Sequence, residues 1–258
     1  MQGCAPSASM MPEWEAPAVV LAARPYGEGD ALVTLLTEAY GPYRGLARGG
    51  GSRSQSALWQ PGNLVQARWV ARLTDQLGTF SAEMVHPGAA LAMDDPLALA
   101  VLSSACAVAE GALPEREPYP AVFAGLVQLI AGLAQGPSAI VDLVRWEAVL
   151  LQELGYGLDI SCCAVTGATA GLAFVSPRTG RAVAAEAAGA WRQKLLPLPG
   201  FLAVFDRTGG GQASPVDWRD GLKLTGYFLA RDAFGHQHRP MPPARHMLYD
   251  RVLALSSE

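Results

Sequence analysis

The sequence lacks long apolar runs and charged tracts. No stretch of about 18 or more uninterrupted apolar residues occurs among the 258 residues, so we expect no membrane span. The first dozen residues carry no basic segment, which argues against a secretory signal, and we expect residues 1–12 to form a disordered leader. Because 50% of the residues are hydrophobic and only 16% are charged, a wholly disordered chain is excluded. The length allows one large domain or two to three small ones.

Cysteine and histidine are scarce, with four of each. Cys162 and Cys163 are adjacent, no cysteine follows them, and the next histidine is His236, so the two close ligand pairs typical of structural zinc are missing. Scattered cysteines fit a reducing cytoplasm. No histidine lies in a nucleophile-elbow, metalloprotease or paired-carboxylate context. We therefore expect no metal, no cofactor and no catalytic residue, and we predict that the protein is not an enzyme.

One segment lacks acidic residues. Between residues 39 and 74 there is neither aspartate nor glutamate, although the whole chain has a net charge of −4. The segment holds five arginines: Arg44, Arg48, Arg53, Arg68 and Arg72. Guanidinium groups pair with phosphates, and the glycine-rich loop at 49–54 would let a polyanion approach the backbone, so the segment predicts a nucleic-acid-binding surface. The alternative is a solvated sheet face whose acids lie elsewhere in the chain.

The first third of the chain is typical of short strands separated by Gly/Pro turns. We expect strands over residues 17–24, 30–38, 43–48, 63–73 and 77–85. Five short strands in about 70 residues is the scale of a small closed barrel. Alternation over 63–73 places Trp69 on an apolar face and Arg68 and Arg72 together on the opposite face. The same alternation over residues 43–49 places Arg44 and Arg48 on one face of their strand.

Trp59 lies beside the polar loop and outside the predicted strands. This position makes Trp59 the better candidate for stacking on a base. The alternative, which the pattern leaves open, is that its ring closes the end of the barrel.

From Asp94 onward the pattern becomes helical. Asp94-Asp95-Pro96 predicts a helix start, with an acidic cap and proline at the first helical position. We expect helices over residues 97–111, 118–134, 137–155, 215–234 and 243–255. Residues 158–198 are irregular, with a hairpin over 173–184 around a tight turn, and the glycine run at 209–211 predicts a flexible joint. The predicted divisions are a barrel at 13–87, helices at 92–157, an insertion at 158–198 and further helices at 199–258.

Seven motifs occur in order between about residue 13 and residue 255. They are Arg-Pro-Tyr-Gly-Glu-Gly-Asp at 24–30, Thr-Glu-Ala-Tyr-Gly at 37–41, the basic glycine loop at 47–54, Arg-Trp-Glu at 145–147, Glu-Leu-Gly-Tyr-Gly-Leu-Asp at 153–159, Cys-Ala-Val-Thr-Gly at 163–167 and Phe-Val-Ser-Pro-Arg-Thr-Gly-Arg-Ala-Val at 174–183. No single motif is decisive. In their order and spacing, the chain resembles the RecO family of bacterial recombination mediators.

The resemblance implies an α+β protein with an N-terminal five-stranded OB-fold barrel followed by a mainly α-helical domain. It implies binding of single- and double-stranded DNA, annealing of complementary strands and, with RecR, help in loading RecA onto DNA coated by single-stranded DNA-binding protein. It also implies a cytoplasmic, nucleoid-associated protein without nucleotide hydrolysis. Some members carry a zinc-ribbon-like insertion with two cysteine pairs. Here Cys162 and Cys163 lack a partner pair, so we expect apolar packing in place of metal.

The family and the charge pattern together suggest a set of site residues. Arg44, Arg48 and Arg53 are the first candidates for DNA phosphate contact, followed by Arg68, Arg72 and Arg24. Annealing requires neutralisation of two phosphate chains, which suits a broad arginine face. An RNA-binding OB-fold module with a helical interaction domain is the alternative function. An enzyme that uses the thiol pair or the histidines is a third class.

The resemblance also implies that the helical domain takes up the acidic, apolar C-terminal tail of single-stranded DNA-binding protein. Arg145, set among Val141, Val144 and Val149, is the candidate partner of the terminal carboxylate of that tail. The alternative is that Arg145 pairs with an acid of its own helix, Asp142 or Glu147.

Overall fold

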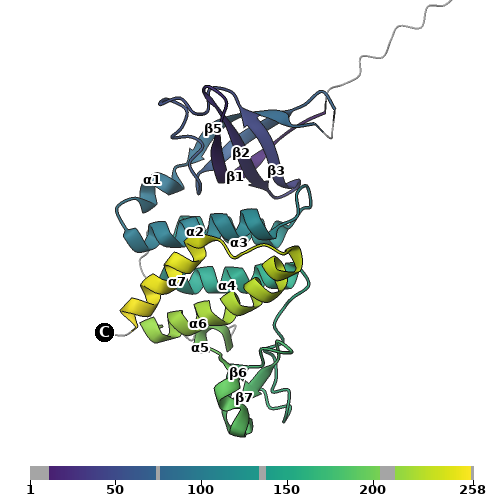
Figure 1. Cartoon of the computed structure of the whole chain (residues 1–258), viewed down its shortest axis with the longest axis vertical. Helices are drawn as coiled ribbons and strands as arrows, with labels where there is room; N and C mark the ends of the chain where they lie inside the picture. The colour runs from purple at the N-terminus through teal and green to yellow at the C-terminus, as the bar shows by residue number, and fades with distance from the viewer. Residues whose placement is uncertain (1–11, 74–75, 134–137, 204–212, 257–258) are drawn as a thin grey trace, which may run out of the picture.

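The computed structural model describes residues 12–73, 76–133, 138–203 and 213–256. Figure 1 shows a β-barrel at one end of the molecule, layers of helices in the middle and a small sheet at the opposite end. The predicted α+β class is therefore confirmed. Residues 1–11 of the predicted leader and the glycine run at 209–211 lie outside the described residues.

The N-terminal part forms a closed five-stranded barrel. Its strands are β1 (Glu13–Tyr26), β2 (Asp30–Thr37), β3 (Gly41–Ala47), β4 (Leu64–Val70) and β5 (Gly78–His86). They close in the order β1-β2-β3-β5-β4, with β3 and β5 parallel and the other pairs antiparallel. Five strands closed in this order form an OB-fold barrel. The predicted strands are present, although β1 begins four residues earlier and ends two residues later than expected.

Aromatic rings fill the barrel. Trp69 is 1% exposed, as the alternation in its strand predicted, and its ring lies against Trp14 and Tyr43. Trp59 also belongs to this core: it is 3% exposed, and its ring centroid lies 6.5 Å from that of Phe80. The prediction that Trp59 stacks on a base is therefore wrong, because a stacked base requires an open ring face. The alternative, a ring inside the barrel end, describes its position.

Helices make up the rest of the body. They are α1 (Gly88–Ala92), α2 (Pro96–Ala112), α3 (Pro120–Gly132), α4 (Ser138–Glu153), α5 (Gly200–Ala203), α6 (Pro215–Phe228) and α7 (Pro243–Leu255). Asp95 caps α2 as predicted, since its carboxylate accepts hydrogen bonds from the backbone N–H groups of Leu97 and Ala98 at 2.8 and 3.2 Å. The predicted helix over 215–234 instead becomes a π-helix at Leu229–Phe234. In the part of the chain that the structure describes, no helix is both long and apolar enough to cross a membrane.

The barrel and the helices touch closely at two turns. The backbone N–H of Arg116, between α2 and α3, donates to the carbonyl of Pro42 at 2.8 Å. Gly41 has a φ of +66°, and a Cβ at this position would lie 1.9 Å from the carbonyl oxygen of Glu117. Only glycine permits both this backbone conformation and this approach. The β3 edge is thereby held against the α2–α3 connection.

The insertion forms a small three-stranded sheet. Its strands are β6 (Leu172–Val175), β7 (Ala182–Ala184) and β8 (Leu196–Pro197), in the order β7-β6-β8. The predicted hairpin corresponds to β6 and β7, whereas β8 was not predicted. Two 3₁₀ helices, η2 (Ala185–Ala187) and η3 (Gly189–Lys194), precede β8.

Cys163 packs in a small apolar cluster of this insertion, with Val183, Ala184 and Ala188. Its Sγ accepts a hydrogen bond from the N–H of Ala184 at 3.2 Å. A hydrogen bond with the side chain of Thr166, together with this N–H, lowers the pKa of the Cys163 thiol to about 6. Among the described residues, no group of three or more histidine, cysteine or acidic side chains is placed to hold a metal ion.

Candidate nucleic-acid interface and groove

Three of the predicted arginines lie on one strand and the loop that follows it. Arg44 is exposed on β3 while its neighbours Tyr43 and Gly45 are buried, so its side chain points away from the barrel core. Arg48 and Arg53 are also exposed. Within the described ranges, no ion pair involves any of these three arginines. Their guanidinium groups are therefore open to an anionic ligand.

The glycine loop after β3 is held against the turn between β1 and β2. The backbone N–H of Gly49 donates to the Asp30 carboxylate at 2.8 Å, and the N–H of Gly51 donates to the carbonyl of Gly29 at 3.0 Å. Gly49 has a φ of +67°, which favours glycine. These bonds fix the backbone that carries Arg48 and Arg53, and so present both side chains from a defined loop.

Arg24 already has an acidic partner in the helical body. Its two terminal nitrogens lie 2.6 and 2.8 Å from the two carboxylate oxygens of Glu110 on α2. The hydrogen bond to Glu110 raises the pKa of the Arg24 guanidinium. This bidentate pair joins β1 to α2. Because the Glu110 carboxylate already occupies its two terminal nitrogens, Arg24 is less available to a phosphate than the arginines of β3 and its loop.

Arg68 is paired as well. Its Nη2 lies 2.6 Å from the Glu13 carboxylate across the β1–β4 pair, and both side chains are 54% exposed. Arg72 is exposed just beyond β4. Arg68 therefore fits the alternative interpretation, in which the arginines of this segment are paired with acids from elsewhere in the chain. Arg44, Arg48 and Arg53 do not fit it.

Arg116 adds a cation that the sequence did not single out, because Glu115-Arg116-Glu117 has the pattern of a solvated acidic loop. Its guanidinium lies 4.9 Å from the centroid of the Tyr43 ring. Arg116 has a φ of +65°, unusual for a residue with a side chain. It shares with Arg44, Leu77 and Glu115 a recess of about 290 Å³. Half-buried Arg116 therefore lies beside Arg44 where the barrel meets the α2–α3 connection, and Glu115 adds an acid to the same recess.

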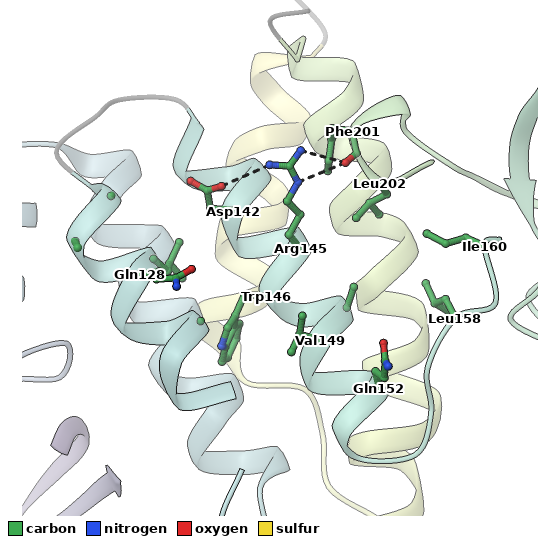
Figure 2. Close-up of a pocket in the computed structure, with 15 residues that line it drawn as sticks. Gln128, Asp142, Arg145, Trp146, Val149, Gln152, Leu158, Ile160, Phe201 and Leu202 are labelled. Carbon is green, nitrogen blue, oxygen red and sulfur yellow. Dashed lines mark hydrogen bonds and ion pairs between the residues drawn. The ribbon is translucent and has the colours of Figure 1, made fainter. Parts of the chain in front are cut away.

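An apolar groove of about 650 Å³ lies in the helical body (Figure 2). It is bounded by α3, α4, α5 and residues 158–160. Its walls include Leu129, Trp146, Val149, Leu158, Ile160 and Leu202. Gln128 and Gln152 add uncharged polar groups at its sides. A groove of this kind can bind a short peptide segment through a few apolar side chains.

Arg145 is the cation of this groove. Figure 2 shows its guanidinium between Asp142 and Phe201. Its Nε and Nη2 donate to the Phe201 carbonyl at 3.4 and 3.3 Å, and its Nη1 lies 3.9 Å from Asp142 Oδ1. The side chain is 43% exposed. Of the two acids in the alternative explanation, only Asp142 is near, at the limit of an ion pair.

Glu147 faces the opposite side of α4 and is completely buried. Its Oε1 lies 2.6 Å from Nε of Arg245 on α7, and its Oε2 accepts a hydrogen bond from the Thr225 hydroxyl on α6 at 2.5 Å. Arg245 also donates to the carbonyl of Leu222 at 2.8 Å. This buried network joins α4, α6 and α7, and thereby fixes the helix that carries Arg145.

Comparison with known proteins decides the family. Residues 10–87 match the family described as recombination protein O N terminal, and residues 93–240 match recombination protein O C terminal. The chain belongs to the RecO family. The first range covers the barrel, and the second covers the helical body from α2 through the inserted sheet to α6, ending before α7.

Several RecO relatives are similar over nearly their whole length. The DNA repair protein RecO of Granulibacter bethesdensis is 60% identical over 245 residues, covering 95% of this chain and 97% of that protein. The DNA repair protein RecO of Gluconacetobacter diazotrophicus is 58% identical over 248 residues, with 94% and 96% covered. That of Acidiphilium cryptum is 56% identical over 240 residues, with 93% and 95% covered. The resemblance found in the sequence motifs is therefore confirmed.

Proposed function

We propose that this member of the RecO family is a DNA repair and recombination mediator. It binds single- and double-stranded DNA, anneals complementary strands and, with RecR, helps load RecA onto DNA coated by single-stranded DNA-binding protein. It acts by binding, without a catalytic step, in the cytoplasm with the nucleoid. The observation that carries the proposal is the set of exposed arginines on an OB-fold barrel, in a chain whose relatives bear the name DNA repair protein RecO.

DNA binding is assigned to the barrel surface formed by Arg44, Arg48 and Arg53. These cations project from β3 and its following loop. Arginines on an open surface neutralise phosphates without reading bases, which suits an activity that must accept any complementary pair of strands. Because Trp59 is buried, it is not assigned a stacking role on this surface. Arg72 is assigned to its margin, and Arg24 and Arg68 contribute less because each already has a carboxylate partner.

The groove around Arg145 is assigned to the acidic, apolar C-terminal tail of single-stranded DNA-binding protein. Apolar walls hold the side chains of such a peptide, and a guanidinium at the rim pairs with its carboxylate. The present partners of Arg145 are a backbone carbonyl at more than 3.2 Å and a carboxylate at 3.9 Å. A peptide carboxylate would displace the carbonyl at small cost, because bonds of that length are weak.

The test is annealing of complementary oligonucleotides coated with single-stranded DNA-binding protein, either intact or without its C-terminal tail. We expect acceleration that depends on the tail. Arg145→Ala should remove the tail dependence and still anneal bare strands, because the barrel is intact. The double variant R48A/R53A should lose annealing of bare strands while its affinity for an isolated tail peptide is kept. Arg251→Ala, which changes an exposed arginine of α7, is the matched control.

Each part of the proposal has its own contradicting result. Acceleration without tail dependence would remove the groove from the mechanism. No acceleration with either form of the coating protein would contradict the mediator function. Preference for RNA over DNA in direct competition would favour the RNA-binding alternative.

A further inference from the structure

The small sheet presents an exposed tryptophan on its 3₁₀ helix η3. Trp191 is 66% exposed, more than any other aromatic residue in the described part of the chain. Its backbone N–H donates to the carbonyl of Ala188 at 3.0 Å, and Ala188 is buried in the cluster with Cys163 and Val183. The backbone is thus anchored while the indole faces solvent. Tryptophan is enriched at binding surfaces, because its indole combines a large apolar area with one polar N–H.

One cation lies against this ring, and the neighbouring cation of the helix lies against a ring of β6. Lys194 Nζ lies 5.1 Å from the centroid of the Trp191 ring, and the guanidinium of Arg192 lies 5.4 Å from the centroid of the Phe174 ring. We call Phe174, Trp191, Arg192 and Lys194 the aromatic–cation surface. Both cations are exposed.

The charge of the insertion differs in sign from that of the chain. Residues 158–198 hold four cations and two acids, a net charge of +2, whereas the whole chain carries −4. One of the two acids, Asp159, is paired with Arg181 at 3.2 Å. Apart from that pair, the insertion holds one acid, Glu186, and three cations, Arg178, Arg192 and Lys194. The local field therefore favours an anionic ligand.

We propose that the aromatic–cation surface is a second binding site, specific for single-stranded nucleic acid. An unpaired base stacks on the Trp191 indole, and Arg192 and Lys194 pair with the flanking phosphates. Stacking platforms with adjacent cations are the usual means of holding single strands without sequence preference. A duplex does not fit, because its bases are stacked on one another and offer no free face along the helix.

The position of the site gives it a role distinct from that of the barrel. The small sheet and the barrel lie at opposite ends of the molecule, with the helices between them (Figure 1). This inference rests on the proposed function, since it takes the barrel arginines as the first site. Two sites at opposite ends let one chain hold two strands that do not compete for the same surface.

The first test is ¹⁹F NMR of the full chain labelled with fluorotryptophan, with Trp191→Phe identifying the Trp191 resonance. Adding short oligo(dT) should shift that resonance, and a blunt duplex of the same length should not. The shift should persist in R48A/R53A, so failure of the barrel assignment and failure of the second site are separate results. An unmoved Trp191 resonance at saturating oligo(dT), or a shift caused only by an acidic peptide, would overturn the proposal.

Affinity provides the second test. In the R48A/R53A background, we expect Trp191→Ala to weaken binding of oligo(dT) about tenfold, the loss typical of one stacked base. Trp191→Phe should lose less, because a ring remains. Tyr227→Ala, which removes another exposed ring outside this surface, is the matched control and should leave binding unchanged. Equal binding by the Trp191→Ala and Tyr227→Ala variants would overturn the proposal.

Discussion

Glu147 and Arg245 form an ion pair sealed inside the helical body, although 98 residues separate them in the chain. Their side chains are 0% and 2% exposed, and Nε lies 2.6 Å from Oε1. Arg145, two residues before Glu147, faces the groove on the other side of α4. The helix therefore has one charged residue that fixes it in the protein and another that is open to a ligand, because positions two apart face different ways on a helix.

Arg245→Met should strongly destabilise the protein. The substitution removes the cation and leaves the buried Glu147 carboxylate without its charged partner, which costs about 3–5 kcal/mol in the free energy of unfolding. Chemical denaturation measures the loss. Arg251→Met on the exposed side of the same helix should stay within about 0.5 kcal/mol of the parent protein. Equal effects of the two substitutions would contradict a special role for the pair.

The ion pair between Arg24 and Glu110 should contribute little to the free energy of unfolding, but removing it should change the salt dependence of DNA binding. Arg24 is 56% exposed, so a double-mutant cycle should give a coupling of about 0.2–1 kcal/mol. Glu110→Gln removes the competing carboxylate charge and should steepen the salt dependence of DNA binding by up to about one unit of slope. Fluorescence anisotropy at several salt concentrations measures the slope. An unchanged slope in Glu110→Gln would show that Arg24 does not face DNA.

Neutralising Arg48 and Arg53 should weaken DNA binding without sequence preference. Each lost phosphate contact lowers the slope of log affinity against log salt by about one, so R48A/R53A should flatten it by about one to two units. Stability should be unchanged, because both side chains are exposed. The R251A variant, with one exposed arginine removed from α7, serves as the reference for a nonspecific loss of charge. A slope equal to that of the parent protein would exclude these two arginines from the interface.

Trp59 should matter for stability and not for stacking on DNA. Trp59→Ala opens a cavity in the barrel core and should cost about 3–5 kcal/mol. Trp59→Phe keeps a ring there and should bind DNA within about twofold of the parent protein, since base stacking worth more than that would require an exposed ring. Thermal unfolding and anisotropy measure the two effects. Loss of DNA affinity in a stable Trp59→Phe protein would contradict this assignment.

The thiol of Cys163 should ionise near neutral pH. Hydrogen bonds from Thr166 and Ala184 lower its pKa to about 6 in the folded protein, against about 8.5 in the unfolded chain. Because the folded pKa is the lower one, the unfolded chain binds more protons between these values, and this group makes the protein more stable as pH rises through that window. The contribution is lost as pH falls through about 6.

Thiolate absorbance in a Cys4→Ser/Cys162→Ser background measures this ionisation directly. The Cys106 thiol does not interfere, since burial raises its pKa to about 12. Thr166→Ala should move the Cys163 transition toward higher pH, while Thr169→Ala, a nearby exposed threonine, should leave it in place. A transition that Thr166→Ala does not move would exclude this hydrogen bond as the main cause.

Local patterns predicted the elements of this protein well. Alternation over 63–73 placed Trp69 in the core and Arg68 on the surface, and the Asp95-Pro96 pair marked the start of α2. Both signals depend on neighbours within a few residues: a strand alternates its faces at every residue, and a cap bonds to the next turn. The third strand of the small sheet was missed because two residues are too short to show a period.

Contacts between residues far apart in the chain could not be predicted from these local patterns. The acids that pair with Arg24 and Arg68 lie 86 and 55 residues away. Arg116 reaches the barrel through its backbone bond to Pro42 and the contact of its guanidinium with the Tyr43 ring. Local periodicity carries no information about contacts between residues so far apart in the chain.

By itself, the sequence determined the class of the protein, the positions of its strands and helices, its family, and the acid-free segment in which five arginines concentrate. Those properties follow from local periodicity, capping and charge, which act over a few residues. Only the tertiary structure decided which arginines remain open, that Trp59 is core, and that Arg145 borders a groove while Glu147 is sealed by Arg245. Each of these depends on elements brought together by closure of the barrel and packing of the helices, so the physical cause lies in contacts between residues far apart in the chain.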